Sequence, residues 1–149
     1  MIRRLILISA ATALLAACGA STPERPASKL TPEEAVAQRA KERWDAILAK
    51  DYARAYEYLT PGTRATTPYE AYAKKLAAST LIWSAAQVED VVCDEPEVCR
   101  ATVYITFTLR SPPVAFQGVS TETPLNERWL QSAGEWYHLP EPAGAQSLQ

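Results

Sequence analysis

The apolar residues of this 149-residue chain change their spacing near Ser79, and this change constrains the fold more than any other feature. Before Ser79 they recur every three or four positions, which is typical of helices packed on a core. After it they alternate with polar residues, which is typical of half-buried strands. In the clearest strand, the apolar residues at alternate positions are Ala101, Val103, Ile105, Phe107 and Leu109. Helices followed by strands predict an α+β domain.

Two copies of the pattern Thr-Pro-x-Glu, at residues 31–34 and 67–70, are typical of helix starts. Thr is a preferred N-cap, Pro fits the first helical position, and Glu can bind the cap backbone in return. The first helix continues through apolar positions at helical spacing: Val36, Ala40, Trp44, Ile47 and Leu48. A shorter helix begins near Asp51 and ends at residues 61–62, and a third runs to about Ala77. The sequence therefore predicts three N-terminal helices.

Four strands are predicted after these helices, at residues 81–92, 101–109, 118–131 and 136–139. A Ser-Ala-Gly-Glu turn at residues 132–135 joins the last two strands. We therefore expect a curved antiparallel sheet of about four strands, with the helices packed on one of its faces.

The first 18 residues have the composition of an export signal. Arg3 and Arg4 precede an apolar run at residues 5–15, and small residues then lead into Cys18 in the sequence Leu-Ala-Ala-Cys. This ending resembles a bacterial lipobox. The apolar run is about ten residues long, whereas a membrane-spanning helix needs roughly 20. The alternatives are an ordinary secretory signal cleaved near Ala17 and a cytosolic N-terminal helix.

The lipobox resemblance and the composition together imply four parts of the chain. They are a lipoprotein signal peptide (1–17), a lipidated Cys18 with a flexible tether (18–30), a folded domain (31–142) and a disordered tail (143–149). Such a chain is held at the bacterial cell envelope by its lipid. Gly19 stands where an Asp would favour the inner membrane, so the resemblance implies the outer membrane, facing the periplasm.

The charge of the chain argues against a nucleic-acid partner. Removal of residues 1–17 takes away Arg3 and Arg4, which leaves 13 basic against 17 acidic residues and changes the net charge from −2 to −4. Phosphate backbones are bound by grouped Lys and Arg, and this chain has no basic cluster. We therefore expect no nucleic acid among its partners.

Cys93 and Cys99 lie at the facing ends of the first two predicted strands. An oxidising compartment and an even pair of cysteines predict a disulfide that closes this hairpin. The two thiols lack the third and fourth ligands that a zinc site needs, and His138, the only histidine, is distant in sequence. Neither a metal nor a cofactor is predicted.

The order of helices and strands resembles the NTF2-like (cystatin-like α+β) superfamily. Two short motifs carry the resemblance: a segment from Trp44 to Pro61 that contains Asp-Tyr and Ala-Tyr pairs, and the hairpin from Glu127 to Tyr137 with its two tryptophans. The resemblance implies a cone-shaped space between helices and sheet, where enzymes of the superfamily place their acids and bases. It also implies a homodimer formed through the open face of the sheet.

The residues themselves give little support to catalysis. His138 lies at the end of the last strand, where we expect a rim or surface position. Glu127 is a candidate general base if its strand face lines the cone, together with a tyrosine such as Tyr58 or Tyr72. A single carboxylate without a placed partner is no catalytic signature, so no catalytic residue is assigned. The alternatives for Glu127 are a salt bridge to Arg64, Arg100 or Arg110 and a place on the open face of the sheet.

Large amphipathic rings are abundant for a domain of this size, and such rings line concave sites and interfaces. The candidate pocket residues are Trp44, Tyr58, Tyr72, Trp83, Glu127 and Trp129. The first hypothesis is an envelope lipoprotein that binds a small hydrophobic ligand or an envelope partner protein without catalysis. The second is an isomerase-like or dehydratase-like enzyme of the cone, and the third is a structural accessory of an envelope assembly.

Overall fold

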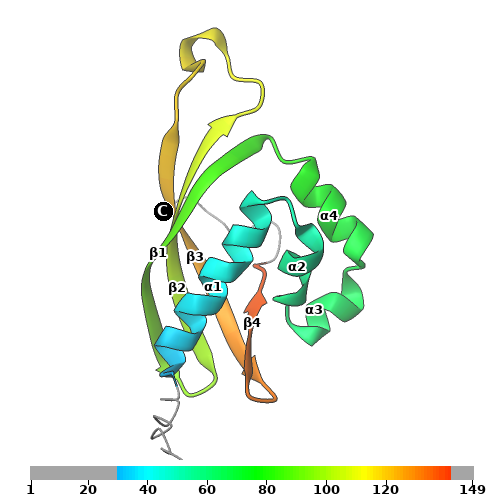
Figure 1. Cartoon of the computed structure of the whole chain (residues 1–149), viewed down its shortest axis with the longest axis vertical. Helices are drawn as coiled ribbons and strands as arrows, with labels where there is room; N and C mark the ends of the chain where they lie inside the picture. Colours follow the sequence, from blue (N-terminus) through cyan, green and yellow to red (C-terminus); the bar gives the residue numbers. More distant parts are fainter. Residues whose placement is uncertain (1–29, 142–149) are drawn as a thin grey trace, which may run out of the picture.

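Four helices lead into a four-stranded sheet in the computed structural model, which describes residues 30–141 (Figure 1). The helices are α1 (Pro32–Leu48), α2 (Tyr52–Glu57), α3 (Pro61–Thr66) and α4 (Tyr69–Ala77). The strands are β1 (Leu81–Glu95), β2 (Val98–Leu109), β3 (Thr121–Ser132) and β4 (Glu135–Leu139), with a short 3-10 helix, η1 (Val114–Phe116), between β2 and β3. The helices lie over one face of the curved sheet (Figure 1). The predicted α+β class is confirmed.

The predicted signal peptide (1–17), Cys18, nearly all of the tether and the tail (143–149) lie outside the described residues. Within residues 30–141, no helix is long and apolar enough to cross a membrane.

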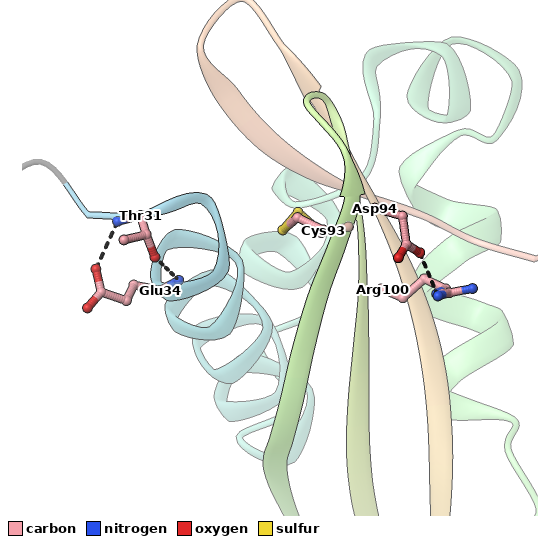
Figure 2. Close-up of a disulfide and its surroundings, with 6 residues drawn as sticks. Thr31, Glu34, Cys93, Asp94 and Arg100 are labelled. Carbon is pink, nitrogen blue, oxygen red and sulfur yellow. Dashed lines mark hydrogen bonds and ion pairs between the residues drawn. A yellow bond between two sulfur atoms is a disulfide. The ribbon is translucent and has the colours of Figure 1, made fainter.

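The first predicted helix start is present in full. The Thr31 side chain accepts a hydrogen bond from the Glu34 backbone at 3.2 Å, and the Glu34 carboxylate accepts one from the Thr31 backbone at 2.8 Å (Figure 2). This reciprocal capping satisfies two backbone donors that the helix itself leaves free. It fixes the point at which the chain enters the domain.

The prediction of three helices is wrong by one, because a further helix, α3, begins at Pro61. Thr60 is the N-cap of α3, and its side chain accepts from the Thr63 backbone at 3.1 Å. Pro61 therefore begins a helix and does not only end one. The second predicted start differs too: Thr67 terminates α3, and α4 begins after Pro68 with no side-chain cap.

The sheet has the order β1-β2-β3-β4, and all neighbours are antiparallel. Three register shifts interrupt the pairing of β1 with β2, at residues 83–85, 88–90 and 92–95. Such bulges add twist and bend a strand, which accounts for the curvature of β1 over the helices (Figure 1). The β3–β4 turn places Ala133 and Gly134 at positive φ, as a type I′ hairpin requires.

The segment between α2 and α3 covers the outer edge of β4. The His138 backbone donates to the Tyr58 carbonyl at 2.7 Å, and the Thr60 backbone donates to the His138 carbonyl at 3.1 Å. Leu59 forms a parallel bridge with His138 between these two bonds. The edge strand is therefore paired along this stretch, which protects it from pairing with another chain.

The interior is divided into two apolar clusters. The cluster that we call the filled end contains Val36, Ala40, Tyr58, Cys99, Ala101, Trp129 and Trp136. It packs the first half of α1 against the β1–β2 and β3–β4 hairpins. The second cluster packs the last part of α1, α2 and α4 against β2; its members are Trp44, Ala46, Ile47, Ala55, Leu59, Tyr72, Val103 and Ile105. This second cluster surrounds a cavity, so we call it the cavity end.

The Cys93–Cys99 disulfide is confirmed, with an S–S distance of 2.03 Å. It joins β1 to β2 next to the hairpin turn, beside an ion pair between Asp94 and Arg100 (Figure 2). Cys99 is fully buried and belongs to the filled end. The bond therefore closes the sheet on the side where the core is packed most completely.

Candidate functional site

A cavity of about 910 Å³ opens between α1, α4 and the sheet. Its volume lies within the range of small-molecule sites in proteins. Most of its wall is apolar and includes Ile47, Leu59, Leu76, Leu81, Ile105 and Leu125. This wall is the cavity end of the core, so the same residues that hold α1 and α4 on the sheet also shape the site.

Glu127 accepts three hydrogen bonds at the base of this cavity. Its Oε1 accepts from the Arg43 guanidinium at 2.6 Å and from the Trp44 indole at 2.8 Å, and its Oε2 accepts from the Trp129 indole at 3.2 Å. Arg43 and Glu127 are both more than nine-tenths buried. Because a buried charge is costly unless it is paired and hydrogen-bonded, this arrangement keeps the base of the site ordered and without net charge.

Glu127 therefore forms a salt bridge, as one alternative predicted, but its partner is none of the three arginines that the sequence analysis named. Arg43 is the partner, and it lies on α1 one residue before Trp44. A signal for it exists in the sequence, because residues 36, 40, 43 and 47 follow helical spacing and form one stripe. Arg43 occupies a position on that stripe that the pattern reserves for apolar residues.

Four side chains that line the cavity each have a buried polar atom with no hydrogen-bond partner among the described residues. These atoms are Nε of Arg43, the hydroxyl of Tyr72, Nε1 of Trp83 and Nδ1 of His138. The four side chains come from α1, α4, β1 and β4 respectively. Buried polar groups are nearly always satisfied in proteins, so four such atoms behind the wall of one cavity are unusual.

His138 is buried and not at the surface, so the expected surface position is wrong. In β4 it shares the inward face with Trp136, and its ring packs against Trp129 at 5.7 Å between centroids. Burial lowers the pKa of His138 well below its ordinary value of 6.5, and the nearby Arg43 guanidinium lowers it further. The imidazole is therefore uncharged at neutral pH.

Tyr72 is also uncharged at neutral pH. Burial raises the pKa of its hydroxyl above 10.0, and the opposing effect of the Arg43 guanidinium is smaller. Arg43 thus lies close to the Tyr72 hydroxyl, although no hydrogen bond of good geometry joins the two. Tyr72 therefore contributes a neutral side chain to the cavity wall.

The structure brings four of the six candidate pocket residues together on the cavity wall: Trp44, Tyr72, Trp83 and Glu127. Trp44 and Trp83 meet edge to face with centroids 6.1 Å apart, and the cavity stays open beside them. Trp129 is fully buried in the filled end and lies behind Glu127. The hydrogen bonds of Glu127 all go to Arg and Trp side chains and none goes to a tyrosine.

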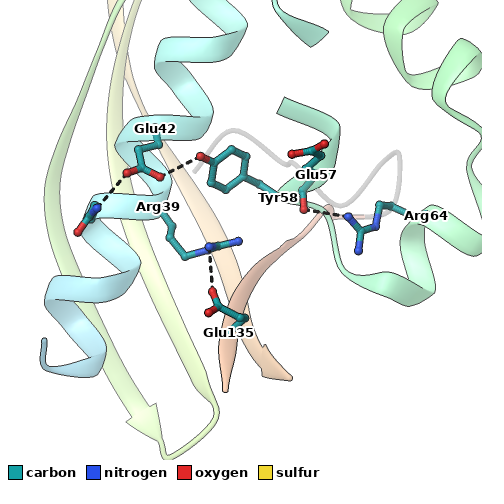
Figure 3. Close-up of polar contacts among 7 residues, drawn as sticks. Arg39, Glu42, Glu57, Tyr58, Arg64 and Glu135 are labelled. Atoms are coloured by element: carbon teal, nitrogen blue, oxygen red, sulfur yellow. Dashed lines mark hydrogen bonds and ion pairs between the residues drawn. The ribbon is translucent and has the colours of Figure 1, made fainter. Parts of the chain in front are cut away.

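Tyr58 lies away from the cavity, in a polar cluster beside α1 (Figure 3). Its hydroxyl donates to Glu42 at 2.9 Å, and Arg39 stacks on its ring at 5.0 Å. Arg39 also forms an ion pair with Glu135 of β4 at 3.0 Å. Its guanidinium carbon lies 5.5 Å from the centre of the Tyr137 ring. These contacts tie α1 to β4 and the end of α2, so Tyr58 has a structural place in the fold.

No group of three or more His, Cys, Asp or Glu side chains suited to a metal ion occurs within residues 30–141.

No protein-family model matches the chain, and no curated protein matches it in sequence. A SEC-C motif containing protein from Psychrobacter arcticus has a similar structure, with a TM-score of 0.56 and 10% identity over 82% of this chain and 67% of that one. TsrD from Streptomyces laurentii is also similar, with a TM-score of 0.51 and 18% identity over 74% of this chain and 88% of that one. A ketosteroid isomerase-like protein from Erwinia carotovora atroseptica has 19% identity over 72% of this chain and 92% of that one. Its TM-score of 0.48 is too low to support an argument. Identities this low show a shared α+β fold and nothing of function.

Proposed function

We propose that the domain is a binding module that takes a small, largely apolar molecule into the cavity between α1, α4 and the sheet. The observation that carries the proposal is the cavity itself: about 910 Å³, with a mainly apolar wall in which a few polar side chains are set, among them Thr63, Thr67, Ser79 and Asn126. A few polar groups set in an apolar wall are the usual composition of a small-molecule site.

The proposal assigns no catalytic step, because Glu127 lacks the surroundings of a general base. Its two oxygens accept hydrogen bonds from Arg43, Trp44 and Trp129. A base must reach the proton that it removes, and here protein donors occupy three of the roughly four acceptor sites of the carboxylate. The pairing of Glu127 with a tyrosine, on which the enzyme hypothesis depended, has no counterpart among these bonds.

The binding test compares two tryptophan substitutions on α4. Ala71 lines the cavity, whereas Ala77, on the same helix, does not. The unlipidated chain is exported to the periplasm and analysed by native mass spectrometry, with titration of a neutral apolar probe, diphenylmethane, by calorimetry. We expect binding to the unchanged chain and to Ala77→Trp, and at least tenfold weaker binding to Ala71→Trp. Equal binding by both variants, or no binding by the unchanged chain, contradicts the proposal.

The second part of the proposal concerns location: the binding module is anchored to the bacterial envelope by lipid on Cys18, facing the periplasm. The support is the lipobox-like sequence at residues 15–18. Labelling with radioactive palmitate in a bacterial host tests it. We expect label and membrane fractionation for the unchanged chain and loss of both in Cys18→Ser. Label that survives the substitution contradicts the anchor.

An envelope partner protein is a second candidate for binding, and one observation favours it. The connection between β2 and β3 projects beyond the rest of the domain (Figure 1) and exposes Val114, Phe116 and Val119, with Val114 84% exposed. Exposed apolar clusters often mark interaction sites. Cross-linking in periplasmic extracts should give an adduct with the unchanged chain, and this adduct should be absent for the double variant Val114→Ser/Phe116→Ser. The homodimer expected from the superfamily would instead give an adduct of twice the mass of the chain.

A further inference from the structure

The lining of the cavity changes from polar at its rim to apolar in its depth. The charged and polar residues that line it and are exposed come from α4, the start of β1, the edge of β3 and the chain after β4: Lys75, Thr80, Asn126 and Glu141. The buried apolar residues of the lining include Ile47, Leu59 and Ile105. A molecule that fills the cavity therefore has one end among hydrocarbon side chains and the other end near water.

The polar atoms in the depth of the cavity are closed to a ligand. Four of them have essentially no accessible surface: Nε of Arg43, the Tyr72 hydroxyl, Nε1 of Trp83 and Nδ1 of His138. The Glu127 side chain is 1% exposed, and its oxygens already accept from three protein donors. A hydroxyl or a charge that a ligand carried to the base would lose its water and find these groups out of reach, which is costly. The inner end of the ligand must therefore be hydrocarbon.

The rim, in contrast, has accessible polar groups. Lys75 and Glu141 are exposed, and neither forms an ion pair within residues 30–141. β4 ends at Leu139, opposite Arg128, so the preceding part of β3 has no strand beside it on this side in the described part of the chain. Asn126 belongs to this edge and lines the cavity. The backbone N–H and C=O groups of an unpaired strand edge are available for hydrogen bonds, so a polar group can be bound or hydrated here.

We propose that the ligand is a single-chain amphiphile, a molecule with one hydrocarbon chain and all of its polar groups at one end. Its chain lies in the depth of the cavity, and its polar head stays at the rim between α4 and the edge of β3. This inference rests on the proposed function and names the class of molecule that the cavity takes. The Arg43–Glu127 pair, at 2.6 Å, fits this class because the two charges compensate each other behind the apolar wall.

Two isomers of decanediol test the inference on the unlipidated chain. 1,2-Decanediol carries both hydroxyls at one end of its hydrocarbon chain, whereas 1,10-decanediol carries one at each end. The two molecules have the same composition, so they differ only in where the hydroxyls lie. Calorimetric titration should give 1,2-decanediol a dissociation constant at least about tenfold smaller. The reason is that 1,10-decanediol must bring one hydroxyl to the base or leave part of its chain outside the cavity.

Two pairs of variants locate the chain of the ligand. Ala71→Trp, on the cavity wall, should weaken binding of 1,2-decanediol at least about tenfold, and Ala77→Trp, off the wall on the same helix, should leave it unchanged. Leu125→Asn adds an amide to the wall on the strand face of Glu127, so it should reduce the preference for 1,2-decanediol about threefold or more. Leu130→Asn, also on β3 and half-buried but off the wall, should keep the preference.

Thermal unfolding of each variant shows whether it is folded, and the comparison of isomers on the unchanged chain stands if a variant is not. Equal binding of the two diols, or tighter binding of 1,10-decanediol, overturns the inference, because polar groups are then accepted at both ends. Binding of diphenylmethane without binding of either diol also overturns it and leaves the proposed function in place. If neither the diols nor diphenylmethane bind, the proposed function itself fails.

Discussion

At the scale of single residues, Glu127 and Arg43 show how a buried ion pair organises the site. The pair is buried on both sides, and two indole N–H groups occupy further lone pairs of the carboxylate. Burying such a pair adds little net stability compared with apolar residues of similar size. Its consequence is geometric, because it fixes Arg43 and Trp44 on α1 against β3 at the base of the cavity.

Breaking the pair from one side should be costly. Glu127→Gln keeps the shape and removes the negative charge, which leaves Arg43 buried with no counter-charge. We expect a loss of about 3–5 kcal/mol in the free energy of unfolding, measured by urea denaturation. The double variant Arg43→Met/Glu127→Gln should lose less than this single variant, because it buries no unpaired charge. The control is Asp45→Asn, which breaks the exposed Lys41–Asp45 pair and should cost about 0.5 kcal/mol or less. Equal losses for Glu127→Gln and Asp45→Asn would contradict this account.

His138 should make stability depend on pH below neutrality. Its folded pKa is depressed, so between that value and 6.5 the unfolded chain binds a proton that the folded chain does not. Stability is therefore complete above pH 6.5 and falls as the pH decreases, by up to about 1.4 kcal/mol per pH unit. Urea midpoints from pH 7.5 to 5.5 measure this slope. Since the chain has one histidine, His138→Gln should flatten the slope in this window. A slope that persists in the variant would assign it to other groups.

The residue-scale predictions from sequence failed where a polar side chain occupies a buried position. Alternation places His138 on the face of Trp136, and helical spacing places Arg43 on the apolar stripe of α1, so the pattern indicated both inward positions. Residue type argued the other way, because Arg and His are mostly exposed. The structure resolves the conflict in favour of the pattern: Arg43 is buried because it pairs with Glu127, and His138 is buried as an uncharged imidazole.

At the scale of elements, the three Thr-Pro sequences of the helical region show how similar local signals lead to different outcomes. Thr31-Pro32 and Thr60-Pro61 both begin helices with a side-chain cap, whereas Thr67-Pro68 does not. Thr67 already ends α3, since its backbone donates to the Thr63 carbonyl at 2.8 Å, and its own carbonyl accepts from the Tyr56 hydroxyl at 2.7 Å. The pattern predicts the helix, and the neighbouring elements decide whether the cap forms.

Thr60 and Thr67 give a matched pair of substitutions. Thr60→Ala removes the cap of α3, which accepts from the Thr63 backbone, and also a 2.7 Å hydrogen bond between the hydroxyls of Thr60 and Thr63. We expect it to lower the free energy of unfolding by about 1 kcal/mol. Thr67→Ala removes no cap and should cost less than about 0.5 kcal/mol. Chemical denaturation of both variants measures the difference, and a larger loss for Thr67→Ala would show that α3 is not stabilised in this way.

At the scale of the whole molecule, the domain combines a packed half and a hollow half on one sheet. The filled end lies under the first half of α1 and is closed by the disulfide, while the cavity end lies under α4 (Figure 1). Sequence patterns predicted the order of helices and strands and the disulfide, and they missed α3. They could not predict the volume of the cavity, because it depends on how far α4 stands from the sheet, and periodicity carries no information on that distance.

This division predicts that a small truncation at the filled end lowers the free energy of unfolding more than a larger truncation at the cavity end. Val36 is fully buried in the filled end, so Val36→Ala should cost about 1.5–3 kcal/mol of unfolding free energy. Leu76 lines the cavity on α4 and is only partly buried, so Leu76→Ala removes a larger side chain and should cost less than about 1.5 kcal/mol. Leu76→Ala should instead weaken probe binding, which Val36→Ala leaves unchanged if the chain is folded. Urea denaturation and calorimetry of the two variants measure both effects. A greater loss of stability from Leu76→Ala would mean that the cavity end carries the fold, and the space beneath α4 would then be packed in solution and unable to hold a ligand.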